Sequence, residues 1–262
     1  MILLHPSIDP VIFSFGFIEV RWYSLSYIAA FIIGVNLIKY LNSKKKINIS
    51  NQLIDNFFIW SVIGVILGGR VGYVIFYQLD VFLQNPKYLF YIWKGGMSFH
   101  GGLTGMVIAI YLFSKKYNLK FFILSDLVSL VAPIGLFFGR IANFINVELV
   151  GRVTEFPFAI VYPTIDKLPR HPSQLYEAFF EGIILFAILM FIFFKNKSNA
   201  NTGIISGYFL FFYGIFRFLI EFLREPDQHL GLILNTISMG QFLCMPVILF
   251  GFIILLKKKE NG

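Results

Sequence analysis

Long apolar runs separated by short polar connections make up most of this sequence of 262 residues. A helix needs about 20 mostly apolar residues to cross the hydrocarbon core of a bilayer. The runs that approach this length lie near residues 18–41, 54–78, 97–114, 121–140, 173–194, 203–223 and 235–256. We expect about seven transmembrane helices there. No internal repeat or long linker separates the runs, so the pattern predicts one polytopic membrane domain over residues 1–262.

Composition supports this all-α membrane class. Hydrophobic residues make up 57% of the chain and charged residues only 14%, whereas a soluble domain is about one quarter charged. The first apolar run follows His5, Asp9 and two prolines rather than a basic segment, so we expect no cleavable signal peptide. Cys244 is the only cysteine, which excludes an internal disulfide.

Lysines set the expected orientation. They cluster after the first run and then at every second connection, which places all clusters on one side of a seven-span bundle. The clusters are Lys39 with Lys44–Lys46, Lys115 with Lys116 and Lys120, Lys195 with Lys197, and Lys257–Lys259. Positively charged loops stay in the cytoplasm. We therefore expect the N-terminus outside and the C-terminus in the cytoplasm. The net charge of +8 comes mostly from these separate loops, so we expect no nucleic-acid partner.

Arginines follow a different pattern. None lies in a lysine cluster, and the expected topology places all of them in or just beyond the outer half of the membrane. They are Arg21, Arg70, Arg140, Arg152, Arg170, Arg217 and Arg224. An arginine in a membrane span is costly, and its planar guanidinium group binds phosphate through two parallel hydrogen bonds. We expect a cationic pocket that faces the outer leaflet.

The stretch GRIANFINVELVGR, residues 139–152, is polar directly after an apolar run. Arg140 and Asn143 lie one helical turn apart, whereas Asn146 and Glu148 are off that face. We therefore expect the helix to end there, with Gly151 assisting the turn. The alternative is an ordinary helix end, with Arg140 reaching the lipid headgroups.

The stretch YGIFRFLIEFLREPD, residues 213–227, places Tyr213, Arg217, Glu221 and Arg224 on one helix face. Arg217 and Glu221 can form an ion pair, either as a lock for the bundle or as part of a site. Because the Arg217 guanidinium group has more donors than one carboxylate accepts, we expect a further partner such as a phosphate.

Three other stretches carry polar groups with structural and functional interpretations. In MSFHGGLTG, residues 97–105, His100 precedes two glycines that leave room for a substrate. In RHPSQLYEAFFEG, residues 170–182, Ser173 is an expected N-cap and Glu177 needs a cationic partner, while Arg170 and His171 are either interfacial or functional. In WYSLSY, residues 22–27, Tyr23 belongs either to an aromatic belt or to the site.

No metal-ligand spacing, glycine-rich phosphate loop or GxSxG motif is present, so we expect no metal and no cofactor.

The stretch GRIANFINVELVG resembles the signature of the bacterial prolipoprotein diacylglyceryl transferases, G-R-x-G/A-N-F-x-N-x-E-x-x-G. The segments SFHGG, RHPSQLYE and RFLIEFLREPD are similar to other characteristic segments of that family and follow in its order. The resemblance runs from about Trp22 to Asp227. Ala142 and Val147 stand where members often carry glycine, which changes packing but removes no polar group.

The resemblance implies a seven-helix enzyme of the bacterial inner membrane. Such an enzyme moves the diacylglyceryl group of phosphatidylglycerol to the lipobox cysteine in the signal peptide of a preprolipoprotein, forms a thioether and releases glycerol phosphate. We expect catalytic roles for His100, Arg140, Arg217 and Tyr23. We expect substrate contacts from Arg140, Asn143, Asn146, Glu148, Gly151, Glu221, Arg224, Tyr213 and His171.

Two questions stay open at the level of sequence. A non-catalytic lipid or anion transporter could use the same cationic pocket, and an intramembrane hydrolase is a further alternative that lacks a nucleophile motif. The substrate thiol needs either a base, for which His100 is the first candidate, or nearby guanidinium groups that lower its pKa. Glu148 and Glu221 are weaker candidate bases, because we expect an arginine partner for each.

Overall fold

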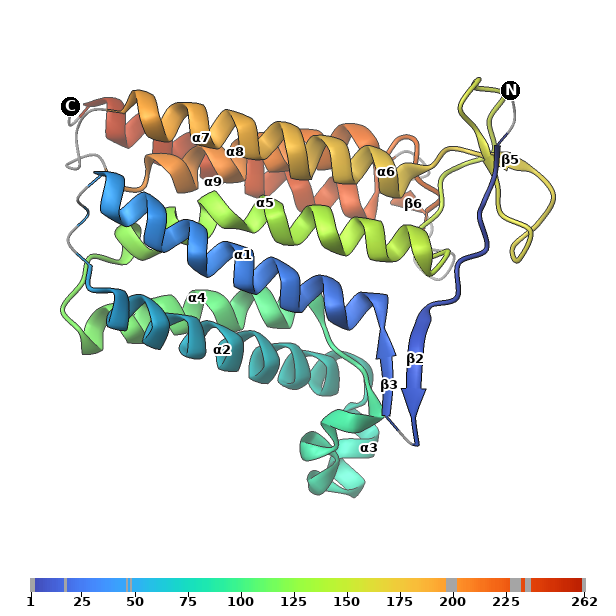
Figure 1. Ribbon diagram of the computed structural model, residues 1–262, viewed down its shortest axis with the longest axis horizontal. Helices are drawn as coiled ribbons and strands as arrows, with labels where there is room; N and C mark the ends of the chain where they lie inside the picture. The colour runs from blue at the N-terminus through green and yellow to red at the C-terminus, as the bar shows by residue number, and fades with distance from the viewer. Residues whose placement is uncertain are drawn as a thin grey trace. The chain divides into compact units, whose positions relative to one another are not determined.

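The computed structural model describes residues 3–16, 18–45, 47, 49–196, 202–226, 232–233 and 237–260. Helices dominate these residues (Figure 1). The α-helices are α1 (Trp22–Lys45), α2 (Asn51–Tyr77), α3 (Leu79–Gln84), α4 (Phe99–Lys116), α5 (Phe121–Ile145), α6 (Ser173–Glu177), α7 (Leu185–Lys195), α8 (Ile204–Ile220) and α9 (Met239–Glu260). The 3₁₀-helices are η1 (Pro86–Phe90) and η2 (Ile92–Lys94), and η3 (Ala178–Ile184) is a π-helix. The strands are β1 (Leu3–Leu4), β2 (Val11–Phe15), β3 (Ile18–Arg21), β4 (Ile160–Val161), β5 (Pro169–Arg170), β6 (Leu232–Ile233) and β7 (Ile237–Ser238).

Five helical segments within the described residues are long and apolar enough to cross a membrane. They are Trp22–Lys44, Asn51–Tyr77, Phe121–Ile145, Ser173–Lys195 and Met239–Lys257. The chain is therefore a multi-pass membrane protein built mainly of helices. The predicted spans at 97–114 and 203–223 correspond to α4 and α8, which are not among the five.

The first predicted span begins too early. Residues 18–21 form β3, which pairs antiparallel with β2, and α1 begins only at Trp22. The segment IEVR alternates apolar and polar residues, which is the period of a strand and not of a helix. The Trp22 amide then donates to the Pro10 carbonyl at 3.2 Å, which ties the start of α1 to the hairpin.

The chain forms two compact units, Ile38–Ser125 and the combination of Met1–Leu37 with Asp126–Gly262. In the Ile38–Ser125 unit, α2 packs antiparallel against α4 through glycines. A Cβ atom on Gly68 would lie 2.3 Å from the carbonyl oxygen of Gly101, and Gly64 approaches Gly105 in the same way. Small residues let two membrane helices approach at backbone distance. The prediction of a single membrane domain stays a prediction.

The larger unit brings the polar ends of its helices together. Helix α8 packs against α7 and α9, and Asp126 near the start of α5 accepts hydrogen bonds from the amides of Gly203 and Ser206 at 2.6 and 2.8 Å. The starts of α5 and α8 therefore meet at one end of this unit. The end of α5, the segment that begins with α6 and the end of α8 meet at the opposite end, where the polar stretches 139–152, 170–182 and 213–227 lie.

Candidate active site

Helix α5 ends as the sequence predicts, and the polar residues that follow it hold one another. The last helical residue is Ile145. The side-chain amide of Asn143 donates to Glu148 Oε2 at 2.7 Å, and that of Asn146 donates to Glu148 Oε1 at 3.3 Å. Glu148 itself is exposed, whereas Asn143 is buried. Among the described residues, the partners of the Glu148 carboxylate are these two side-chain amides. The prediction that an arginine pairs with Glu148 is therefore wrong.

The loop after α5 has an unusual backbone that α6 holds in place. Val147 and Leu149 have φ angles of 57° and 55°, in the left-handed region that disfavours branched side chains. Gln174 donates to the carbonyl of Glu148, and the Ser173 hydroxyl donates to the carbonyl of Leu149 at 2.7 Å. Ser173 is therefore not the expected N-cap: Pro172 holds the cap position, and the hydroxyl serves the loop instead.

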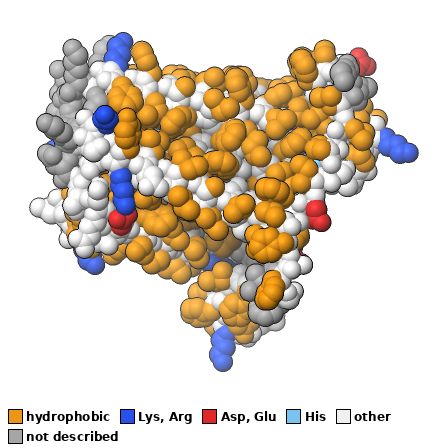
Figure 2. Space-filling view, in the orientation of Figure 1, with side chains coloured by type: hydrophobic (Ala, Val, Ile, Leu, Met, Phe, Trp, Pro, Cys, Tyr) orange, Lys and Arg blue, Asp and Glu red, His pale blue; other side chains and the backbone are white. Residues whose placement is uncertain are grey.

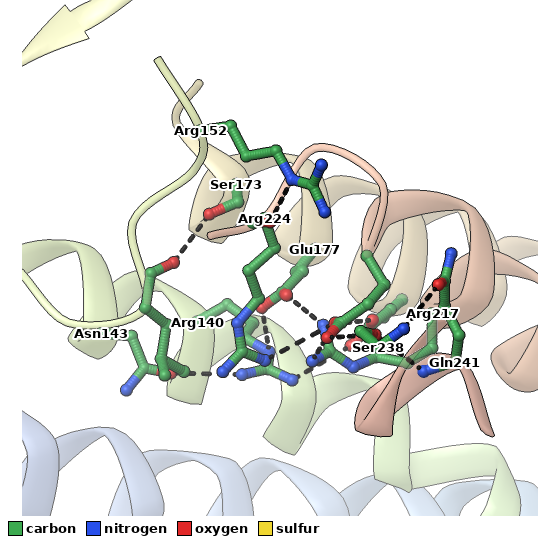
Figure 3. A network of polar contacts seen from close by, with 12 residues as sticks. Arg140, Asn143, Arg152, Ser173, Glu177, Arg217, Arg224, Ser238 and Gln241 are labelled. Carbon is green, nitrogen blue, oxygen red and sulfur yellow. Dashed lines mark hydrogen bonds and ion pairs between the residues drawn. The ribbon is translucent and has the colours of Figure 1, made fainter. Parts of the chain in front are cut away.

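Buried arginines and glutamates from several helices meet next to this loop (Figure 3). This ion-pair cluster consists of Arg140 on α5, Glu177 on α6, Glu181 on η3, Arg217 on α8, and Glu221 with Arg224 directly after α8. Glu177 contacts two arginines: its Oε2 lies 2.9 Å from Arg140 Nε, and its Oε1 pairs with Arg217. Its predicted need for a cationic partner is confirmed.

Glu181 and Glu221 complete the ion-pair cluster. The nearest nitrogens to Glu181 are Arg140 Nη2 at 3.5 Å and Arg217 Nη1 at 3.9 Å. Glu221 lies 2.9 Å from Arg217 Nη2 and 3.8 Å from Arg224 Nη1. The predicted pair between Arg217 and Glu221 is confirmed. Arg217 reaches three carboxylates, and the phosphate that the sequence analysis expects as its further partner stays a prediction.

The π-helix η3 places the second buried carboxylate. The side chains of Glu177 and Glu181 have no exposed surface. Glu177 is the last residue of α6, and Glu181 lies four residues later, in η3. A Cβ atom on Gly182 would lie 2.7 Å from Cβ of Phe137, so η3 and α5 approach closely here. π-helical turns often occur at functional sites.

The start of α9 supports Glu221. Ser238 and Gln241 form a capping box, because the Gln241 amide donates to Ser238 Oγ at 3.1 Å and the Ser238 amide donates to Gln241 Oε1 at 3.0 Å. The Ser238 hydroxyl also donates to Glu221 Oε1 at 3.0 Å. The sequence analysis missed Glu181, Ser238 and Gln241, although the S-x-x-Q spacing at 238–241 is a readable capping signal.

Gly151 lies where three segments cross. A Cβ atom there would lie 2.3 Å from the carbonyl oxygen of His171, so only glycine fits. The neighbouring Arg152 donates through Nε to the carbonyl of Arg224 at 3.0 Å, which joins this loop to the ion-pair cluster (Figure 3). His171 Nδ1 lies 3.4 Å from the Tyr176 hydroxyl, and burial lowers the pKa of His171, which favours its neutral form.

Arg170 forms a separate group. It pairs with Asp166 at 2.7 Å and with Glu225 at 3.2 Å, and hydrogen bonds from Arg170 and the Leu168 amide hold the pKa of Asp166 below its usual value. Arg21 pairs with exposed Glu19. Of the arginines in the larger unit, Arg140, Arg217 and Arg224 meet in the ion-pair cluster, whereas Arg170 and Arg21 have other carboxylate partners. The expected outward-facing cationic pocket stays a prediction.

Arg70 is also satisfied elsewhere, in the Ile38–Ser125 unit. Its guanidinium group donates to the carbonyls of Tyr88, Leu89 and Gly95 at 2.7, 3.1 and 2.6 Å. Its side chain is almost fully buried, at 2% exposure. Arg70 therefore stabilises the segment between α2 and α4.

The remaining expected site residues are aromatic or imidazole side chains. Tyr23 lies in the first turn of α1, and its hydroxyl is 3.2 Å from that of Tyr27. Tyr213 precedes Arg217 by one turn of α8 and stacks on Phe209. His100 is exposed in the first turn of α4, within the Ile38–Ser125 unit, and its role as the thiol base stays a prediction.

Comparison with known proteins gives a consistent match over nearly the whole chain. The family model described as "Prolipoprotein diacylglyceryl transferase" matches residues 10–257. The phosphatidylglycerol–prolipoprotein diacylglyceryl transferase of Rickettsia felis is 47% identical over 249 residues, which cover 95% of this chain and 96% of that protein. The protein of the same name from Idiomarina loihiensis is 48% identical over 257 residues, covering 98% and 95% of the two chains.

Proposed function

This chain belongs to the prolipoprotein diacylglyceryl transferase family, and from that premise we propose the reaction and the site that carries it out. The protein is a transferase that moves the diacylglyceryl group of phosphatidylglycerol to a prolipoprotein. We propose that the acceptor is the lipobox cysteine in the signal peptide of a preprolipoprotein and that the two substrates meet at the ion-pair cluster.

The reaction exchanges one bond for another. The cysteine sulfur attacks the sn-3 carbon of the diacylglyceryl group, and the bond from that carbon to the phosphate oxygen breaks. A thioether forms, glycerol phosphate leaves, and the thiol proton passes to a base or to solvent. Negative charge builds up on the phosphate as the bond breaks, so fixed cations next to it lower the barrier.

The ion-pair cluster is the observation that carries this proposal. Arg140 and Arg217 approach the same two carboxylates from α5 and α8, and their side chains keep 16% and 11% of their surface exposed. A guanidinium group carries five N–H donors, more than the carboxylate contacts of Arg140 or Arg217 use, and a bidentate contact fixes the orientation of a phosphate. Arg140 and Arg217 thus bind and stabilise the phosphate, while Glu177 and Glu221 hold them in place.

The other expected residues have proposed roles of their own. Asn143 and Asn146 position the exposed carboxylate of Glu148 next to the ion-pair cluster. Gly151 and Arg224 pair through their backbones and position the loop after α5. His171 and Tyr213 lie in neighbouring segments and contact substrate in this proposal. Glu221 already contacts Arg217 and the Ser238 hydroxyl, so we do not assign it as the thiol base. His100 remains our candidate for the thiol base, with Tyr23 as a further catalytic group.

We also propose seven spans in the bacterial inner membrane, with the site toward the outer face. Support for the spans comes from the large apolar side chains that the helices expose, including Ile32 on α1, Leu67 on α2, Phe191 on α7 and Phe250 on α9. Hydrophobic side chains cover much of the face drawn in Figure 2. With a length of 17 residues, or about 25 Å, α8 is at the lower limit for a span. Lys195 and Lys257 lie at the helix ends opposite the ion-pair cluster, which supports an outward site with a cytoplasmic C-terminus.

A transfer assay tests the proposed function. Purified protein is incubated with phosphatidylglycerol labelled in its acyl chains and with a peptide that contains a lipobox cysteine. We expect label on the peptide through a thioether, and no label on a matched peptide with serine in place of cysteine. Lipid that binds without any labelled cysteine would contradict the transferase proposal.

A further inference from the structure

The ion-pair cluster has no net charge available for an anionic ligand. It contains Arg140, Arg217 and Arg224 against Glu177, Glu181 and Glu221, so its formal charge is zero when all are ionised. The phosphodiester of phosphatidylglycerol carries one negative charge at neutral pH. Bringing it to a neutral, buried cluster leaves an uncompensated charge, which is costly away from water.

Two of the three carboxylates make short ionic contacts with the arginines. Glu177 lies 2.9 Å from Arg140 and pairs with Arg217. Glu221 lies 2.9 Å from Arg217 and accepts a hydrogen bond from the Ser238 hydroxyl at 3.0 Å. A proton on either would remove a short ion pair that holds the phosphate-binding arginines.

Glu181 differs from both. Its side chain has no exposed surface, and its nearest cations are 3.5 and 3.9 Å away. Its contacts with both arginines are long, and neither of its carboxyl oxygens accepts a hydrogen bond of normal geometry from the described residues. A buried carboxylate without hydrogen bonds is the one that accepts a proton most easily.

The groups that face Glu181 reinforce this difference. Besides Arg140 on α5 and Arg217 on α8, they include the Glu177 carboxylate on the preceding turn, whose like charge disfavours a second anion. Tyr213 on α8 and Cys244 on α9 are the other titratable neighbours. When a phosphate engages the two arginines, it weakens the cationic field that keeps Glu181 ionised.

We propose that Glu181 is the proton-binding residue of the headgroup site: it takes up one proton when an anionic phosphate binds to Arg140 and Arg217, and releases it when the phosphate leaves. This inference rests on the proposed function, because it assumes that the phosphate binds at the ion-pair cluster. The proton comes from solvent, so no other reactant is needed.

The proposed proton uptake determines how the affinity for phosphatidylglycerol changes with pH. If the complex holds one proton more than the free protein, raising the pH weakens binding, by up to about tenfold per pH unit. The dependence disappears at low pH, where Glu181 is already protonated in the free protein. A neutral lipid should show no such slope, because it brings no charge to compensate.

Calorimetric titration of the purified full chain tests the inference. Dihexanoyl phosphatidylglycerol is titrated from about pH 5.5 to about pH 9 in two buffers of different ionisation enthalpy, which gives the number of protons taken up. For the wild-type chain we expect uptake approaching one proton and an affinity that falls with pH. Dihexanoylglycerol, which lacks the phosphate, is the neutral control.

Two variants locate the proton. Glu181→Gln mimics the protonated state, so its affinity should be independent of pH and at least equal to that of the wild type at alkaline pH. Glu155→Gln, at an exposed position outside the cluster, should keep the wild-type slope. The inference is overturned if wild-type binding takes up no proton, a result that needs no variant to fold, or if Glu181→Gln keeps the slope.

The transfer assay on the same preparation separates the two proposals. Lipidation of the peptide without proton uptake on lipid binding would refute only the role of Glu181. Proton uptake without lipidation would support that role and contradict the transferase reaction.

Discussion

Arg70 and Arg140 are both largely buried arginines, but their partners give them different properties. Backbone carbonyls surround Arg70, and these neutral acceptors satisfy its donors without neutralising its charge. Carboxylates surround Arg140, and the loop beside it ends in the exposed carboxylate of Glu148. Arg70 therefore holds a loop together, whereas Arg140 belongs to a balanced set of charges that an incoming anion can rearrange.

At the residue scale, His100 is the proposed thiol base, and His100→Asn tests that assignment. A peptide cysteine has a pKa of about 8.5, so little thiolate is present at neutral pH and a base accelerates attack. We expect the variant to lose transfer at neutral pH but to keep its affinity for phosphatidylglycerol. Transfer should approach the wild-type rate near about pH 9, where the thiol ionises without help.

The measurement follows lipid binding and transfer on one preparation across the pH range. Normal transfer by His100→Asn at neutral pH would show that the histidine is structural. Loss of lipid binding together with transfer would make it a headgroup ligand instead of a base.

Short elements rather than long helices shape the centre of the site. The segment from α6 to η3 presents Glu177 and Glu181 to the arginines, and the capping box at the start of α9 supports Glu221. These elements are local in sequence, but their partners lie up to 41 residues away along the chain, which is the separation of Arg140 and Glu181. Their positions therefore depend on how α5, α8 and α9 pack.

Ser238→Ala tests the capping box as a positioning element. Loss of an N-cap costs about 1 kcal/mol of stability, and loss of a hydrogen bond to a charged group costs about 1.5–3 kcal/mol. We expect lower thermal stability and transfer slowed by roughly tenfold at saturating lipid, because Glu221 no longer orients Arg217. Ser238→Thr, which keeps the hydroxyl, should restore most of the rate. A wild-type rate in Ser238→Ala would exclude the positioning role.

Sequence patterns predicted these elements unevenly. The end of α5 at Ile145 was predictable, because Asn146 and Glu148 leave the helix face that Arg140 and Asn143 share. The strand at 18–21 was missed because an apolar count alone does not separate period two from a helix. The buried position of Glu181 could not be read from its neighbours, since Arg140 and Arg217 come from other segments.

At the scale of the whole molecule, charge separates the two ends of the helices. The larger unit carries the ion-pair cluster at one end, while Lys195 ends α7 and Lys257 lies in the last turns of α9 at the other. The proposed topology predicts this separation, because it places the lysines in the cytoplasm and a site for an outer-leaflet lipid at the opposite end. The polar loop that contains Lys167 then faces outward.

Cysteine labelling tests this orientation. Lys167→Cys and Lys195→Cys, both at exposed positions, are each introduced into a chain with Cys244→Ala. We expect an impermeant maleimide to label position 167 in intact spheroplasts and position 195 only after lysis. Labelling of position 195 from outside would reverse the topology and place the ion-pair cluster toward the cytoplasm.

The central claim is that the guanidinium group of Arg140 binds the phosphate of the lipid, and Arg140→Lys tests this claim most directly. Lysine keeps the charge but loses the planar fork, so a bidentate phosphate contact is lost in Arg140→Lys as it is in Arg140→Ala. Loss of a charged hydrogen bond in a desolvated site costs about 2–4 kcal/mol, which corresponds to a rate lower by roughly 30- to 1000-fold. The decisive measurement is the rate of diacylglyceryl transfer from phosphatidylglycerol to the lipobox peptide by both variants at matched amounts of folded protein. We expect both rates to fall within that range, whereas a near-normal rate in Arg140→Lys would contradict phosphate recognition by the guanidinium group.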